Sequence, residues 1–279
     1  MNQNRAKYLS WLAIVLSATT LTAKADQLDD IMRRGELVCG VLGTDEPFSY
    51  MKDPSTREIV GYDVDLCNTV ARGLGVKATL KQISAAARIP ELQQGRVDLI
   101  AASLTHNKER ESQIDFSVST FISGQKAMVR RDSGIHKLAD IDGKRVLTIK
   151  GSTMEANIAA KLKGAQTISF DTNPQALLAL QQGKGVAYVN DETSLVGNLV
   201  KIGSDAKDYV LLPEYFSKEH IALGIRKNEP RLKAKVDKIL IGMEASGDAQ
   251  KAYEKWFGTG TKINLPVRSF KIETDKIDD

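Results

Sequence analysis

Apolar runs of strand length alternate with helical patterns of apolar and polar positions along most of the chain. In the first half, the pattern predicts strands over residues 36–42, 76–83 and 97–102. It also predicts helices over 62–74, started by Asp63, and over 88–94, with Gly95 as C-terminal cap. Strands and helices in this alternation indicate an α/β fold with a mostly parallel sheet flanked by helices.

A second unit repeats this plan further along the chain. Strands are predicted over 145–150, 166–170 and 186–189, and helices over 154–162 and 174–182. The stretches that begin at Leu92 and Leu180 read LQQGRVDLI and LQQGKGVAYV. Helix–glycine–strand turns often look alike, but the matched order of elements favours two similar α/β lobes.

The last part of the chain does not begin a third lobe. One strand is predicted over 221–226, followed by a helix from Pro230 and another over 248–256. We therefore expect the chain to cross between lobes near residue 124 and to return near residue 221, through a two-strand hinge. Lobe 1 would comprise residues 26–124 and 223–279, and lobe 2 residues 125–222.

Residues 1–25 are interpreted as an export signal. Arg5 and Lys7 precede a mostly apolar stretch over 9–21, and Ala23-Lys24-Ala25 forms a small-x-small cleavage site. The alternative is a membrane anchor, but spanning a bilayer takes about 20 apolar residues. We expect cleavage after Ala25 and a periplasmic protein without direct membrane insertion.

Removal of this leader changes the charge of the protein. The leader holds three of the 39 basic residues and no acidic one, which leaves 36 bases against 35 acids. Nothing in this balance indicates binding to nucleic acid or to an anionic membrane. The cysteines, Cys39 and Cys67, are interpreted first as small buried hydrophobes, and a disulfide in an oxidising compartment stays open.

Motifs of common enzymes are absent from the sequence. There is no GxxxxGK[ST], HExxH or GxSxG pattern. The histidines, His106, His136 and His220, lack metal-ligand spacing. No metal site and no cofactor are therefore expected.

Candidate binding chemistry is concentrated between residues 84 and 117. Arg88 begins an amphipathic helix, and a short apolar strand follows. A loop with Ser103 and Thr105 comes after the strand, and Arg110 lies five residues after Thr105. Open α/β sheets place ligand crevices at such strand ends. Because a guanidinium matches a carboxylate in two parallel hydrogen bonds, the segment predicts a site for a small carboxylate-bearing molecule.

These features occur together with short sequence motifs that resemble those of a known family. In chain order the motifs are GVLGTDEPFSY, VGYDVDLCNTVA, LTHNKERESQIDFS, KGST and VAYVNDE. The chain resembles the periplasmic polar amino acid-binding proteins of ABC importers, solute-binding protein family 3. It is closest to the glutamate/aspartate-binding branch, through SAAARIP from Ser84 and Leu104-Thr105. The resemblance implies a two-lobed periplasmic binding protein fold of type II.

The resemblance also implies roles for residues at the strand ends. Arg110, helped by Thr105, would clamp the ligand α-carboxylate; the alternative is a solvated arginine in a charged run. Asp191 and Ser103 would receive the ligand ammonium. Asp191 could equally cap the helix that follows it.

Further ligand-binding residues are implied in both lobes. Ser152 and Thr153 begin a lobe 2 helix, whose N-terminus favours an anion and whose hydroxyl could also act as N-cap. Phe48 and Tyr50 would form an aromatic wall, although Phe48 could instead belong to the core. Ser84 completes the implied set.

Selectivity for the ligand side chain departs from the nearest branch. Leu42 stands where that branch carries an arginine, and Asn173 stands where it carries a histidine. Arg88 remains and could pair with a side-chain carboxylate or a carboxamide. Glutamate or aspartate stays the first expectation, with glutamine, asparagine or another polar carboxylate close behind.

The expected function is that of a monomeric binding protein that closes two lobes around an amino acid and docks on a membrane ABC permease. One alternative is a cyclohexadienyl dehydratase-like enzyme on the same fold, with Glu192 or Asp191 as general acid. The other is a ligand sensor for a separate membrane receptor.

Overall fold

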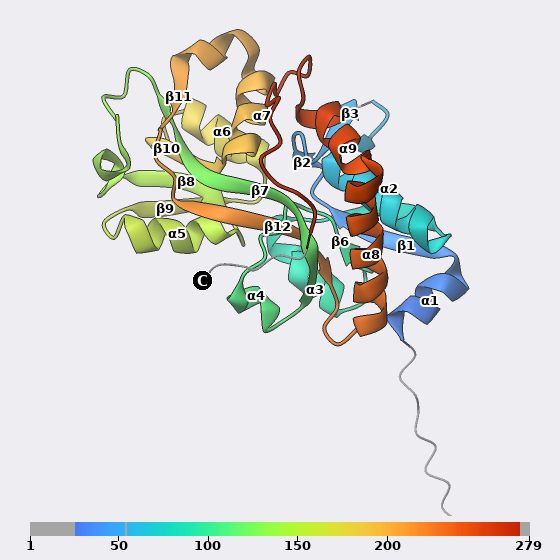
Figure 1. The fold of residues 1–279 in the computed structure, drawn as a ribbon. Coiled ribbons are helices and arrows are strands. Elements are labelled where there is room, and N and C mark those ends of the chain that lie inside the picture. The colour runs from blue at the N-terminus through green and yellow to red at the C-terminus, as the bar shows by residue number, and fades with distance from the viewer. Residues whose placement is uncertain (1–25, 54, 274–279) are drawn as a thin grey trace, which may run out of the picture.

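The computed structural model describes residues 26–53 and 55–273, so the predicted leader lies outside the described residues. Two α/β lobes lie side by side and are joined by two long strands, β7 (Asp115–Arg130) and β12 (Ser217–Ile225) (Figure 1). None of the helices in the described ranges combines the length and the apolar character needed to cross a bilayer. The predicted α/β class and two-lobe plan are therefore confirmed.

Lobe 1 is built on three parallel strands, β5 (Lys77–Gln82), β1 (Glu36–Val41) and β6 (Leu99–Ile100). Its helices are α1 (Gln27–Arg34), α2 (Tyr62–Leu74), α3 (Arg88–Gln93), α4 (Lys108–Glu111), α8 (Pro230–Ser246) and α9 (Asp248–Phe257), with a 3₁₀ turn at Ala85–Ala87. A small antiparallel sheet of β2 (Thr44–Asp45), β3 (Ser49–Asp53) and β4 (Glu58–Val60) projects from it. This small sheet and α1 were not predicted.

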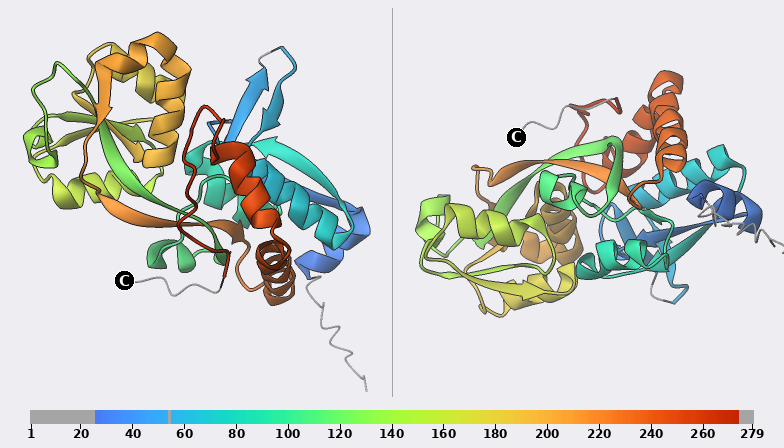
Figure 2. Two further views of the ribbon diagram at one scale, coloured as in Figure 1. Left: turned by 45° about the horizontal axis from the view of Figure 1, so that its top comes forward. Right: turned by 90° about the horizontal axis from the view of Figure 1, so that it is seen from below.

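Lobe 2 repeats the plan with parallel strands β10 (Ala187–Asp191), β8 (Arg145–Ile149) and β9 (Gln166–Phe170). Its helices are α5 (Thr153–Lys161), α6 (Asn173–Gln181) and α7 (Glu192–Ile202), with 3₁₀ turns at Leu138–Ile141 and Gly203–Asp208 and a short strand β11 (Tyr209–Leu211). Side chains of α5 pack on one face of the sheet, and those of α6 and α7 pack on the other. Figure 2 shows both lobes from two further sides.

The hinge strands join the two sheets into one. In the described part of the chain, nine strands form a continuous sheet, and β12 and β7 pair antiparallel at its centre. β6 of lobe 1 pairs with β12, and β10 of lobe 2 pairs with β7. The expected lobe boundaries, near residues 124 and 222, fall inside these two strands.

The cysteine interpretation needs correction. Cys39 on β1 and Cys67 on α2 are fully buried, as expected of small core residues, but they also form a disulfide with a Cα–Cα distance of 6.4 Å. Helix α2 packs on the lobe 1 sheet and brings the two positions within bonding range. This distance depends on tertiary packing, which the sequence pattern does not define.

Helix α2 has the predicted bounds but a different start. Gly61 occupies the N-cap position, and Gly75 ends the helix in the left-handed conformation. Asp63, expected to start the helix, instead turns inward and accepts a hydrogen bond of 2.8 Å from the backbone N–H of Ser103. This carboxylate therefore connects α2 to the strand end where the predicted site begins.

Candidate functional site

A cavity lies between the lobes, where the carboxyl ends of strands from both lobes meet, as expected for open α/β sheets. Lobe 1 lines it with Leu42, Asp45, Ala85, Arg88, Ser103, Thr105 and Arg110. Lobe 2 lines it with Ile149, Ser152, Thr153, Met154, Asn173, Asn190 and Asp191. The structure thus brings together seven predicted site residues: Arg88, Ser103, Thr105, Arg110, Ser152, Thr153 and Asp191.

Arg110 lies in the cavity wall and is buried, so the alternative of a solvated arginine is wrong. The side chain of Asn107 caps the short helix α4 by accepting from the backbone N–H of Arg110. The guanidinium donates to the carbonyls of Thr105 (2.8 Å) and, across the cleft, Gly151 (3.2 Å). Within the described residues it therefore uses two of its five N–H groups.

Arg88 is bound more completely by the protein. Its guanidinium donates to the carbonyls of Ala85, Ala102, Ser103 and Gly151, at 2.9 to 3.1 Å. Four of its five N–H groups are thus engaged within the described chain. Burial, and secondarily the neighbouring Arg110, lowers the pKa of Arg88 to about 9. Arg88 has much less hydrogen-bonding capacity left for a ligand than Arg110 has.

Ser103 adopts a backbone conformation that is unusual for a residue with a side chain, with φ of 47°. Two buried carboxylates hold it there, since Asp63 accepts from its N–H and Asp45 accepts from its hydroxyl at 2.7 Å. Strained backbone of this kind is concentrated at functional sites. Ser103 is therefore rigidly positioned, with its carbonyl bound by Arg88.

The lobe 2 turn presents the N-terminus of α5 to the cavity. Ser152 occupies the N-cap position, but its hydroxyl donates to the Ile149 carbonyl and makes no capping bond within the described structure. The Thr153 hydroxyl lies between Gln125, which donates to it, and Glu219, which accepts from it at 3.1 Å. The N-cap hydrogen bond considered as an alternative role for this turn is thus absent from Ser152 in the described residues, which leaves the positive end of the helix facing the cleft.

Asp191 ends β10 and faces the same cavity. It occupies the N-cap position of α7, yet its side chain makes no capping bond to the described residues. Its Oδ1 atom is buried and has no hydrogen-bond partner among them. Burial, together with Glu219 and Asp45, raises the pKa of Asp191 well above its usual value. A buried carboxylate with an unsatisfied oxygen is an acceptor for a cationic donor.

Hydrogen bonds connect the lobes directly across the cleft. Asn173 at the start of α6 donates to Asp45 at 2.7 Å, and it accepts from Tyr188 and Asn190 within lobe 2. Beside this link, the Gly151 carbonyl receives both guanidinium groups of lobe 1. The structure therefore represents the lobes in a closed arrangement.

Three of the predicted residues do not line the cavity. Phe48 is fully buried in lobe 1, where Phe121 and Phe257 surround it at centroid distances of 5.1 and 5.6 Å. Tyr50 contacts Trp256 edge-on, with ring centroids 6.2 Å apart, and both border another depression. The aromatic wall is therefore wrong for this cavity, because non-local aromatic packing recruits both rings. Ser84 is exposed and borders a neighbouring depression.

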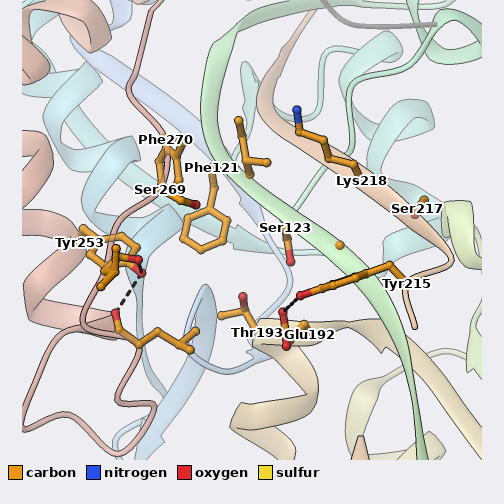
Figure 3. Close-up of a pocket in the computed structure, with 14 residues that line it drawn as sticks. Phe121, Ser123, Glu192, Thr193, Tyr215, Ser217, Lys218, Tyr253, Ser269 and Phe270 are labelled. Atoms are coloured by element: carbon orange, nitrogen blue, oxygen red, sulfur yellow. Dashed lines mark hydrogen bonds between the residues drawn. The ribbon is translucent and has the colours of Figure 1, made fainter. Parts of the chain in front are cut away.

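A second, larger cavity of about 430 Å³ lies against the hinge strands, and Figure 3 shows its lining. Phe121 and Ser123 of β7 and Tyr253 of α9 contribute to it, together with four residues near the end of the described chain: Leu265, Val267, Ser269 and Phe270. None of the ten predicted site residues lines it. Glu192, considered as a general acid, points here and accepts a 2.6 Å hydrogen bond from Tyr215.

Sequence reasoning missed three buried carboxylates around the cleft, those of Asp45, Asp63 and Glu219. Asp45 and Asp63 lie in the motifs GVLGTDEPFSY and VGYDVDLCNTVA, and an available signal was the position of Asp63 between Tyr62 and Val64. Glu219 lies on β12 and accepts from Thr153 and Asn157. Within the described ranges, no group of three or more potential ligands is arranged to hold a metal ion.

Comparisons with known proteins agree with this geometry. Residues 37–259 match the family described as bacterial extracellular solute-binding proteins, family 3. The ABC transporter glutamine-binding protein GlnH of Bacillus subtilis is 32% identical over 84% of this chain and 85% of its own length. The L-glutamate/L-aspartate-binding protein of Pseudomonas aeruginosa is 30% identical, over 91% and 90%.

Among solved structures, an ancestral amino acid-binding protein described as a precursor of cyclohexadienyl dehydratase is similar to this chain. It superposes with a TM-score of 0.75 at 30% identity and covers 83% of this chain and 99% of its own. The similarity thus extends over both lobes and includes the cleft between them.

Proposed function

Because the chain belongs to the bacterial extracellular solute-binding proteins, family 3, we propose that it is the solute-binding component of an amino acid ABC transporter. It binds a polar α-amino acid between its lobes in the periplasm and delivers it, as a monomer, to a membrane permease. The names of its relatives, which bind glutamine or glutamate and aspartate, support an amino acid ligand.

One observation carries the proposal: a buried arginine and a buried, unsatisfied carboxylate line the same cavity. Arg110 has three N–H groups that no described residue accepts, which suits the α-carboxylate. Asp191 has a free buried oxygen, which suits the α-ammonium. Two groups of opposite charge in one cavity match the zwitterionic head of an amino acid.

Closure explains how the site would select its ligand. In this arrangement both guanidinium groups donate to the Gly151 carbonyl, an acceptor supplied by the opposite lobe. A ligand carboxylate is a stronger acceptor than a carbonyl and would take over part of this role. Because a ligand that contacts both lobes binds the closed state better than the open state, it shifts the protein toward closure.

Titration calorimetry tests this function on mature protein that has been unfolded, freed of carried-over ligand and refolded. We expect one or a few of the twenty amino acids to bind. Arg110→Ala should weaken binding about 30-fold or more, because removing one partner of a buried charged pair costs about 2 kcal/mol or more. Arg96→Ala removes an exposed arginine of the same lobe and serves as control. Equal affinity of the two variants would refute the carboxylate clamp.

The dehydratase alternative is tested with the same preparation. The similar ancestral structure is itself an amino acid-binding protein, which favours binding over catalysis. Glu192 is paired with Lys126 at 2.7 Å and faces the second cavity, so it is not placed to act in the cleft. Turnover of prephenate or arogenate by the refolded protein would replace the transport proposal with an enzymatic one.

A further inference from the structure

The cleft holds more buried carboxyl groups than guanidinium groups, which disfavours an acidic ligand. Four buried carboxylates gather around it, compared with the two guanidinium groups of Arg88 and Arg110. Asp45 and Asp191 line the cavity, whereas Asp63 and Glu219 do not line it but accept hydrogen bonds from the lining residues Ser103 and Thr153. Glutamate or aspartate would add two carboxylates and one ammonium, and so would increase the excess of negative charge. Burying uncompensated charge is costly, and neighbouring carboxylates raise one another's proton affinity.

The protonation behaviour of the carboxylates agrees with this excess. Burial raises the pKa of Asp45, and burial together with Glu219 and Asp45 raises the pKa of Asp191. The pKa of Asp63 is also raised, mainly by burial and further by the neighbouring Asp45. An additional donor or cation beside these groups would favour their ionised form, whereas a further anion would favour their protonation.

Arg88 does not supply the missing positive partner for a side-chain carboxylate. Four of its five N–H groups already donate to backbone carbonyls. A bidentate pair needs two parallel N–H groups, so Arg88 offers at most a single hydrogen bond while these contacts persist. Leu42, which also lines the cavity, adds no donor.

Asp45 is the carboxylate placed to contact the side chain of the ligand. It lies on β2, lines the cavity and is only 3% exposed. Its two oxygens accept at 2.7 Å from Ser103 of its own lobe and from Asn173 of the other lobe. A carboxylate has about four acceptor positions, so Asp45 can also accept from a donor on the ligand.

We propose that Asp45 makes this site specific for an α-amino acid whose side chain ends in an amide or a cation, and that it rejects glutamate and aspartate. The inference rests on the proposed function, because it assumes that the amino acid head group binds Arg110 and Asp191. It replaces the acidic ligand expected from the sequence with a ligand that donates to Asp45.

Calorimetry with matched ligand pairs tests the inference without any variant. Glutamine and glutamate differ by an amide in place of a carboxylate at nearly the same volume, as do asparagine and aspartate. We expect the tightest ligand among glutamine, asparagine, arginine, lysine and histidine. We also expect glutamine and asparagine each to bind at least tenfold tighter than the matching acid.

Two aspartate variants connect this preference to Asp45. Asp45→Asn keeps the volume, removes the charge and adds a donor, so the affinity ratio of amide to acid should fall at least tenfold. Asp53→Asn changes an exposed aspartate of the neighbouring strand β3 and should leave the ratio unchanged. If Asp45→Asn does not fold, Asp45→Ser removes the same charge with a smaller side chain.

The possible results separate the two proposals. Tightest binding of glutamate, aspartate or an amino acid without an amide or cationic side chain overturns the inference and leaves the proposed function intact. An unchanged ratio in folded Asp45→Asn also overturns it. If no amino acid binds to the refolded wild-type protein, the proposed function fails, and the inference fails with it.

Discussion

A glycine on helix α7 lets the two lobes approach each other away from the cavity. A Cβ atom added at Gly197 would lie 2.2 Å from the backbone oxygen of Glu46 and 2.9 Å from its carbonyl carbon. Gly197 belongs to lobe 2, whereas Glu46 follows β2 of lobe 1. Because the atoms that Cβ would meet are backbone atoms, no side-chain rotation relieves the clash. Gly197→Ala therefore acts on lobe closure.

The size of the effect follows from this geometry. Restoring ordinary carbon–oxygen contact requires the lobes to separate by about 1 Å, and forced overpacking costs about 1–3 kcal/mol. If the clash exists only in the closed state, ligand affinity should fall about 5- to 150-fold. The open state should not be harmed, because alanine inside a helix is favoured over glycine by about 0.5–1 kcal/mol.

Calorimetry and thermal unfolding together measure both parts of this prediction. Affinity of Gly197→Ala for the identified ligand should fall, while the melting temperature without ligand should stay level or rise. Gly242→Ala on α8 is the control, because its added Cβ has no neighbour within 4 Å. Equal affinities of the two variants would refute the closure contact. A lowered melting temperature without ligand would show that Gly197 stabilises the fold rather than the closed state.

Two further predictions concern stability. Replacing both cysteines with alanine (Cys39→Ala, Cys67→Ala) should lower the free energy of unfolding by about 3–4 kcal/mol, because the disulfide closes a loop of 28 residues; unchanged urea unfolding would contradict this. Burial raises the pKa of Asp63 to about 7 from its ordinary 3.8, so the folded state holds a proton that the unfolded chain releases, and stability should fall as the pH rises from about 4 to about 7. The free energy of unfolding of Asp63→Asn relative to the wild type should therefore be higher at pH 8 than at pH 4. An equal difference at both pH values would refute the assignment.

Regular elements could be predicted because their signals are local. The helix Tyr62–Leu74 and the strand Gln166–Phe170 have the predicted bounds. Helix α1 was missed although its signals are present, with Asp26 as cap and Gly35 in the left-handed conformation at its end.

The site could be predicted only where a residue type indicates its chemistry. Arg110 and Asp191 line the cavity as expected, since charged groups at strand ends converge in this fold. Phe48 was expected in the aromatic wall with the core as the alternative, and its core placement depends on aromatic rings from β7 and α9 that are distant in sequence. The importance of Asp45 was equally hidden, since its burial depends on contacts with Ser103 and Asn173, distant in sequence.

Lobe 1 is formed by two chain segments that are separated in sequence by lobe 2, and this has a consequence for biosynthesis. Strand β6 pairs with β12, and the apolar core of lobe 1 includes Leu232 and Val236 of α8 and Phe257 of α9. Lobe 2 consists of consecutive elements between the hinge strands, so it can assemble before the final helices have been synthesised. The lobe 1 residues that precede β7 wait longest for their partners, and their exposed apolar surfaces are where chaperones would bind during folding.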